Sequence, residues 1–167
     1  MMRNPIERAS SNYWLMVQQG LQQNPLAPPM TIVDYAKSNK IENNWMTRFL
    51  TNKMSGPLQQ EDLQLAKDIL AAKFIVGLLE FKEESLQRFD EYFGWNMLPS
   101  GPQGETTERQ KCVKQKLAKA PDSNTFSRIP VKEGSKEASL LLLQNNFDME
   151  LYKYAKELFQ TQKSLFM

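Results

Sequence analysis

One short apolar run constrains most strongly what this 167-residue chain can fold into. Residues 74–79, with the sequence FIVGLL, are rich in strand formers and lie between two helical patterns. A run of this kind predicts a buried parallel strand, because helices cover both faces of a parallel sheet. The other periodic segments are amphipathic helices without a sheet to cover. We therefore expect an α/β fold of which this chain supplies a mostly helical part of a larger parallel sheet.

Capping residues and apolar spacing predict where the helices begin and end. Asn4 has the pattern of an N-cap, Pro5 takes the first helical position, and Glu7 follows three residues after the cap. Asp148 is predicted to cap the last helix. Residues 41–53 are interpreted as a loop with a helical turn, and residues 96–131 as a long polar loop that contains a short basic helix. The expected helices cover residues 4–20, 31–38, 59–71, 83–93, 135–144 and 148–166.

Composition excludes several classes of function. The net charge of +2 gives no dense basic surface for general nucleic-acid binding. The chain has no histidine, which excludes Ser-His and Cys-His nucleophile pairs and histidine metal sites. A single cysteine, Cys112, allows neither an internal disulfide nor a thiolate metal cluster. No apolar run approaches the roughly 20 residues that span a bilayer, so we expect no membrane contact within this chain.

The segment that carries chemistry lies at the start of the first helix. Arg3 follows a possible strand end at Met2 and precedes the helix N-terminus, where backbone N–H groups and the helix dipole favour an anion. Ser11 lies further along the same helix. A guanidinium fork and a hydroxyl together suit a phosphate dianion. The local physics alone favours a solvated helix start with no ligand over an anion site.

The string RNPIERASSNY (residues 3–13) resembles the 3′-phosphate-binding motif of sulfotransferases that use 3′-phosphoadenosine 5′-phosphosulfate. That motif reads Arg-Asp/Asn-Pro-x-x-Arg-x-x-Ser-x-Tyr/Phe, and its first Arg and its Ser bind the donor's 3′-phosphate. The resemblance assigns these roles to Arg3 and Ser11. Arg8 matches the second arginine, which we expect to orient the motif, and Ser10 is off register. Later strings that resemble Golgi-type, carbohydrate-directed members are NNWMTRFL, EDLQLAKDIL, FIVGLLEFKEESLQRFDEYFGW and NNFDMELYKYAKELF.

The resemblance implies the C-terminal portion of a P-loop-like sulfotransferase fold over residues 1–167. In the family, an earlier strand-loop-helix binds the 5′-phosphosulfate, and the catalytic base usually precedes the 3′-phosphate motif. No Gly-Lys-Ser/Thr loop occurs in this sequence. We therefore expect a partial domain without catalytic residues, which is inactive alone. The complete protein would transfer a sulfuryl group to a carbohydrate hydroxyl at the Golgi membrane.

Several alternatives stay open at this point. The chain can instead be a non-catalytic helical interaction module derived from a sulfotransferase; a kinase-like nucleotide enzyme is disfavoured by the missing phosphate loop. Asn44, Trp45 and Arg48 suit a sugar acceptor, although packing explains Trp45 as well. The basic run Lys111, Lys114, Lys116 and Lys119 suits a sulfated glycan or is a solvated helix face.

Overall fold

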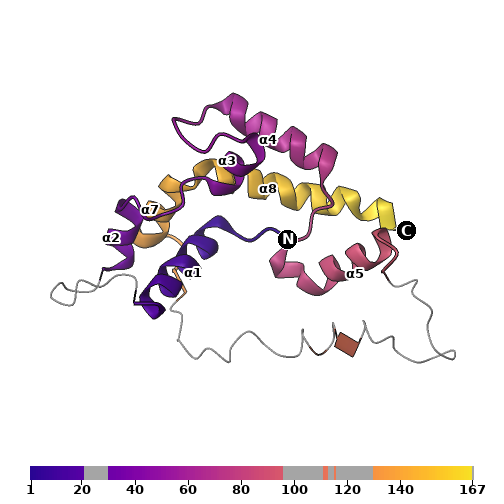
Figure 1. Cartoon of the computed structure of the whole chain (residues 1–167), viewed down its shortest axis with the longest axis horizontal. Helices are drawn as coiled ribbons and strands as arrows, with labels where there is room; N and C mark the ends of the chain where they lie inside the picture. The colour runs from indigo at the N-terminus through magenta and orange to yellow at the C-terminus, as the bar shows by residue number, and fades with distance from the viewer. Residues whose placement is uncertain (21–29, 96–110, 113–114, 116–129, 167) are drawn as a thin grey trace.

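The computed structural model describes residues 1–20, 30–95, 111–112, 115 and 130–166, and most of these residues are helical. The expectation of a mostly helical chain is therefore confirmed. α8 runs through the middle of the structure, α4 lies along it, and α1, α2 and α7 gather at one end (Figure 1). The elements are α1 (Pro5–Gln18), α2 (Ile32–Lys37), α3 (Trp45–Thr51), α4 (Gln60–Lys73), η1 (Leu79–Phe81), α5 (Lys82–Tyr92), α7 (Lys136–Gln144), α8 (Asn146–Thr161) and η4 (Gln162–Phe166).

Local capping signals place most of these helices correctly. The Asn4 side chain accepts hydrogen bonds from the backbone N–H groups of Ile6 and Glu7, as an N-cap does. Thr31 forms a capping box with Asp34 at the start of α2. The expected starts of α1 and α2 are thus confirmed, as are the positions of α4, α5 and α7 to within two residues.

The expected parallel strand is the main correction. Residues 74–78 are extended, but among the described residues they pair only through one isolated parallel bridge between Met2 and Leu78. The run is also shorter than predicted, because η1 begins at Leu79. Apart from this bridge, the described part of the chain contains no β-strand and no parallel sheet. The apolar pattern still has a physical basis, since Val76 and Leu78 are buried.

Two hydrophobic cores hold the helices together. The first joins the Met2–Leu78 bridge to α4 and α8 through residues that include Leu63, Leu151 and Phe159. The second lies among α1, α2 and α7, with Tyr35 and Leu141 at its centre. α1 therefore packs into this core through the side that carries Tyr13. Arg3, which precedes the helix, is left to line a pocket.

Two further predictions are wrong for one shared reason. Residues 41–53 were expected to form a loop with a helical turn, but Trp45–Thr51 forms the α-helix α3. Asp148 was expected to cap the last helix, but α8 begins at Asn146 and the Asp148 carboxylate bonds to the first turn of α3. The carboxylate thus caps a helix about a hundred residues away in sequence, a contact that local patterns do not reveal.

The long polar segment predicted between residues 96 and 131 falls almost entirely outside the described residues. Of the basic helix expected within it, the described residues 111, 112 and 115 are helical. Lys114, Lys116 and Lys119 lie outside the described residues. Cys112 is exposed and carries a free thiol.

Candidate functional site

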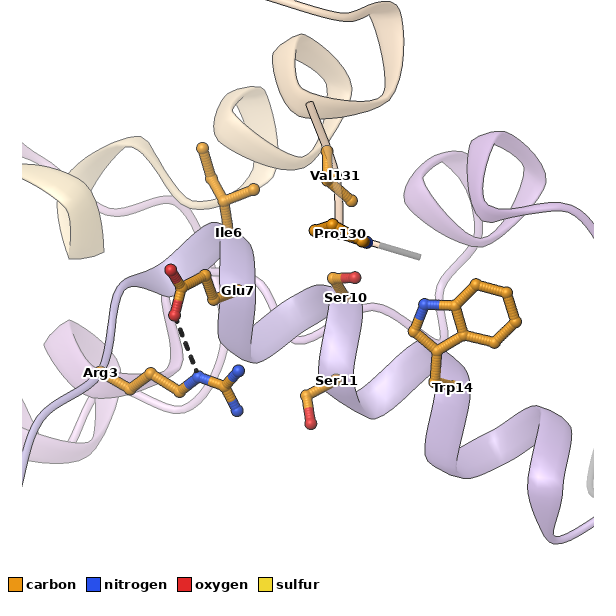
Figure 2. Close-up of a pocket in the computed structure, with 8 residues that line it drawn as sticks. All are labelled: Arg3, Ile6, Glu7, Ser10, Ser11, Trp14, Pro130 and Val131. Atoms are coloured by element: carbon orange, nitrogen blue, oxygen red, sulfur yellow. Dashed lines mark hydrogen bonds and ion pairs between the residues drawn. The ribbon is translucent and has the colours of Figure 1, made fainter. Parts of the chain in front are cut away.

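The structure brings Arg3 and Ser11 to one pocket beside α1. This pocket, called here the α1 pocket, has a volume of about 330 Å³. Ser11 lies in α1, and Arg3 directly precedes the Asn4 cap of that helix, so both side chains reach the same pocket wall. Figure 2 shows the polar side chains around the pocket. Its lining residues are Arg3, Ile6, Glu7, Ser10, Ser11, Trp14, Pro130 and Val131.

Arg3 is the cation of the α1 pocket. Its Nε lies 3.3 Å from Glu7 Oε2, which forms an exposed ion pair one turn apart along the chain. No described residue bonds to its two terminal nitrogens, so the guanidinium keeps a two-pronged donor face. An exposed ion pair of this spacing contributes only about 0.3–0.5 kcal/mol, so an incoming anion can displace Glu7 at little cost.

The backbone at this helix start differs from the sequence-based expectation. Free N–H groups were expected to point toward a ligand, but Asn4 Oδ1 accepts from Ile6 N at 2.9 Å and from Glu7 N at 3.4 Å. Pro5 has no N–H. The first-turn amides are therefore already used by the cap. Of the groups at this helix start, side chains and the helix dipole are what would attract an anion.

The two serines of the motif occupy different environments. Ser10 is buried, with 7% of its surface exposed, while Ser11 is partly exposed. Both line the α1 pocket, and in Figure 2 their hydroxyls point in different directions. Of the two, Ser11 lies nearer to the Arg3 guanidinium in this view. The in-register serine of the motif is thus on the solvent-facing wall of the pocket.

Arg8 faces away from the α1 pocket and holds α1 against the rest of the fold. Its Nη2 donates to Asp148 Oδ2 at 2.9 Å, and its Nε lies 3.5 Å from Glu42 Oε2 in an ion pair that is not a hydrogen bond. The guanidinium also lies 5.5 Å from the centre of the Trp45 ring. These contacts tie α1 to α3 and α8; that Arg8 orients the motif stays a prediction.

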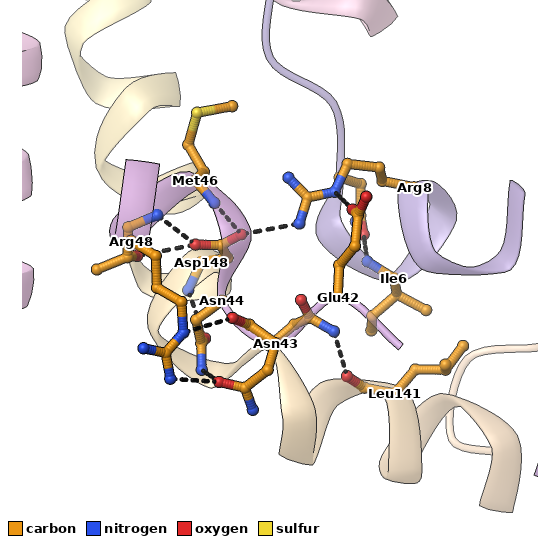
Figure 3. Close-up of polar contacts among 12 residues, drawn as sticks. Ile6, Arg8, Glu42, Asn43, Asn44, Met46, Arg48, Leu141 and Asp148 are labelled. Atoms are coloured by element: carbon orange, nitrogen blue, oxygen red, sulfur yellow. Dashed lines mark hydrogen bonds and ion pairs between the residues drawn. The ribbon is translucent and has the colours of Figure 1, made fainter. Parts of the chain in front are cut away.

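Asp148 is the centre of this buried network (Figure 3). Its carboxylate accepts hydrogen bonds from Met46 N at 2.9 Å, Thr47 N at 2.7 Å and Thr47 Oγ1 at 2.8 Å, in addition to Arg8. Only 1% of Asp148 is exposed. In the other direction, Asp148 N donates to Asn44 Oδ1 at 3.1 Å, so the start of α3 and the start of α8 each bond to the other. One carboxylate thus couples the α1 motif to α3 and α8.

The residues proposed for a sugar acceptor separate into two groups. Asn44 is buried and has a left-handed backbone conformation (φ 48°), and Arg48 donates to the backbone carbonyls of Asn43, Lys53 and Gly56. Both side chains hold the loops around α3 in place. Trp45 is 38% exposed and stacks on Phe49 with 5.1 Å between ring centres. Its ring therefore stays accessible at the surface.

Sequence reasoning missed an apolar pocket that adjoins the α1 pocket. It has a volume of about 520 Å³ and shares Trp14, Pro130 and Val131 with the α1 pocket. The Trp14 indole N–H is buried and has no hydrogen-bond partner in the described part of the chain. Trp14 lies one helical turn beyond Ser10 and Ser11, a spacing that could have indicated its place in the pocket wall. The remaining lining residues are Tyr13, Met30, Thr31, Ile32, Lys132, Ser135 and Glu137.

Among the described residues, no group of three or more histidine, cysteine or acidic side chains is placed to hold a metal ion. None of the described helices has the length and apolar character that crossing a bilayer requires. Comparison with known protein families, with curated proteins and with solved structures found no match.

Proposed function

We propose that this chain is the nucleotide 3′-phosphate-binding part of a sulfotransferase that uses 3′-phosphoadenosine 5′-phosphosulfate. The observation that carries the proposal is the convergence of Arg3 and Ser11 on the α1 pocket. These are the residues that the resemblance assigns to the 3′-phosphate. Arg3 would offer a bidentate fork and Ser11 a hydroxyl, and the positive end of the α1 dipole lies at the same place.

The residues of the α1 pocket fit a phosphate with one adjustment. The Glu7 carboxylate has to leave Arg3, because an anion and a carboxylate compete for the same guanidinium. The pair is exposed, with 33% of the Arg3 side chain and 64% of the Glu7 side chain accessible, so the exchange takes place largely in water. Arg8 does not need to move, since Asp148 and Glu42 already hold it.

The proposed activity of the complete protein is transfer of a sulfuryl group to a carbohydrate hydroxyl. The donor supplies the sulfuryl group, and charge that develops in transfer is stabilised by cations, by analogy with phosphoryl transfer. Residues of this chain bind and orient the nucleotide end. We assign no catalytic residue within the chain, and we propose that the isolated chain does not catalyse transfer. A Golgi membrane location belongs to the same proposal.

For the fold of the complete protein, we propose a P-loop-like parallel sheet of which this chain forms one side. Its support is the parallel bridge between Met2 and Leu78, which places the α1 N-terminus directly after an extended segment. Nucleotides bind at the carboxyl ends of parallel strands in α/β folds. The α1 pocket has this position relative to the Met2 segment.

A titration with adenosine 3′,5′-bisphosphate, measured by isothermal calorimetry, tests the proposed nucleotide binding. Arg3→Ala is expected to weaken binding about 10- to 100-fold, and Ser11→Ala about 3- to 10-fold, since a hydrogen bond to a charged group contributes more than a neutral one. Lys153→Ala is the matched control, because it removes an exposed cation that does not line the α1 pocket. Adenosine 5′-monophosphate, which lacks the 3′-phosphate, should bind far more weakly. Equal affinity of the folded Arg3→Ala variant and the wild type would remove the basis of the assignment.

A helical interaction module is the second candidate function. It is favoured by the dominance of helices in the described chain and by exposed apolar side chains on them, such as Phe49 and Leu143 at 57% and 70% exposure. A module of this kind would fold cooperatively as a monomer and show no heat of binding with adenosine 3′,5′-bisphosphate. The same titration therefore separates the two functions.

A further inference from the structure

Two polar side chains of α1 have no hydrogen-bond partner in the described part of the chain. One is Ser10, of which only 7% is exposed, and the other is Trp14, whose indole N–H is buried. Ser10 is off the register of the phosphate motif, and neither side chain has a role in the proposed nucleotide binding. Polar groups that are buried without a partner are rare in folded proteins, so this pair calls for an explanation.

Ser10 and Trp14 point into the same gap. They lie four residues apart on α1, a spacing that puts two side chains on one face of a helix with about 5–6 Å between their Cβ atoms. Figure 2 shows the Ser10 hydroxyl directed toward Trp14 and the indole nitrogen directed toward Ser10, with Pro130 beside them. A single acceptor atom placed in this gap can take hydrogen bonds from both the indole N–H and the hydroxyl.

The gap lies where the α1 pocket meets the apolar pocket beside it. Ser10 lines the first of these pockets, and Trp14 lines both. The apolar pocket has a volume of about 520 Å³, within the range of about 300–1,000 Å³ that is usual for small-molecule sites. The Tyr13 hydroxyl donates to Met30 O at 3.0 Å, which ties α1 to the segment before α2 and so holds two walls of the pocket together. A ligand with its polar end in the gap can therefore extend an apolar body into this pocket.

The charges around the apolar pocket do not select an ion. Lys132 and Glu137 line it with opposite charges, whereas Arg3 and Glu7 line only the α1 pocket. The two groups at the gap are uncharged. The indole N–H of Trp14 can only donate, so the polar end of the ligand has to be an acceptor. These requirements describe an uncharged molecule with an apolar body and a carbonyl oxygen.

We propose that Ser10 and Trp14 form a second binding site, which takes an uncharged carbonyl compound with its apolar body in the apolar pocket. The carbonyl oxygen accepts hydrogen bonds from Trp14 Nε1 and Ser10 Oγ, and the body packs against apolar wall residues such as Ile32 and Val131. The site is separate from the proposed nucleotide binding, because the Arg3 guanidinium has no part in it. Its ligand is recognised by hydrogen bonding and shape, and not by charge.

A fluorescence titration of the full chain with 6-propionyl-2-(dimethylamino)naphthalene tests this site. This probe is an uncharged ketone whose emission shifts to the blue in apolar surroundings, and the wild type should bind it saturably with such a shift. Trp14→Phe keeps an aromatic ring and removes the N–H, so it should bind the ketone about three- to tenfold more weakly, the loss that one hydrogen bond predicts. Ser10→Ala should weaken binding about two- to fivefold for the same reason. Trp45→Phe is the matched control, because Trp45 lines neither pocket, and its affinity should be unchanged.

A second probe and a third variant separate this site from non-specific apolar binding and from the α1 pocket. 2-(Dimethylamino)naphthalene lacks the carbonyl, so it should bind more weakly than the ketone and about equally to the wild type, Trp14→Phe and Ser10→Ala. Arg3→Ala should bind the ketone as the wild type does. The proposal is overturned if the ketone does not bind saturably, if neither Trp14→Phe nor Ser10→Ala weakens its binding, or if Arg3→Ala weakens it as much as Trp14→Phe. Circular dichroism checks that each variant is folded, and Ser10→Ala alone decides the outcome if Trp14→Phe is not.

Discussion

Asp148→Asn exchanges one carboxylate oxygen for an NH₂ group. We expect it to destabilise the protein more than any similar one-atom exchange among the side chains that join α1, α3 and α8. The Asp148 carboxylate accepts four hydrogen bonds of 2.7–2.9 Å and is 1% exposed. An amide keeps one oxygen as acceptor, and its NH₂ group then opposes two donors. Removing one partner of a buried ion pair costs about 3–5 kcal/mol, and this range includes the lost cap of α3.

The size of the effect is measurable by urea denaturation and by thermal melting. For a chain of this length, 1 kcal/mol corresponds to about 2–4 °C in the melting temperature, so we expect a decrease of about 6–20 °C. Glu150→Gln is the control, since it breaks an exposed pair with Lys153 on the same helix and should cost under about 0.5 kcal/mol.

A double-mutant cycle with Arg8→Met tests the proposed coupling. The Asp148→Asn change should cost less in the Arg8→Met background, because the cation that it leaves unpaired is already gone. The reasoning is refuted if Asp148→Asn lowers the free energy of unfolding by less than about 1 kcal/mol, or if its cost is the same in both backgrounds.

Three further predictions concern affinity, packing and pH. Glu7→Gln should tighten binding of adenosine 3′,5′-bisphosphate about three- to fivefold in calorimetry, because a competing charge near Arg3 is removed in a high-dielectric setting; weaker binding would mean that Glu7 positions the guanidinium. Gly77→Ala should lower stability to urea by about 1–3 kcal/mol, because the new methyl group overlaps the Phe89 ring, and unchanged stability would contradict the close packing. Burial raises the pKa of Tyr35 to about 12. The folded state therefore keeps its full contribution from Tyr35 below about pH 10 and loses it as the pH rises toward 12. The tyrosinate absorbance near pH 12 should be smaller in Tyr35→Phe than in the wild type, and an equal absorbance would contradict the raised pKa.

Local sequence signals were enough to predict the helices that are capped by their own neighbours. Asn4, Thr31 and Ser135 each accept a hydrogen bond from a backbone amide within three residues. The residues that form the sequence pattern are therefore the same ones that make the contact. The grouping of Arg3 and Ser11 was predictable for the same reason, since Arg3 directly precedes the N-cap of the helix that carries Ser11.

Contacts between distant segments account for what the sequence did not predict. The α3 helix has an N-cap residue, Asn44, without a side-chain cap, and it depends on Asp148. The strand propensity of residues 74–79 was visible, but pairing requires a second segment, and Gln162 and Ser85 take the place of one. The walls of both pockets likewise include Pro130 and Val131, which reach α1 only through tertiary packing.

The Asp148 carboxylate also sets a constraint on the order of folding. It joins Arg8 across 140 residues and Thr47 across 101, so both contacts have very high sequence separation. Loops of this length must close before the contacts contribute free energy, which slows folding. During synthesis, α1 and α3 leave the ribosome long before residue 148. The orientation of α1 against α3 and α8 is therefore fixed only after residue 148 has been synthesised.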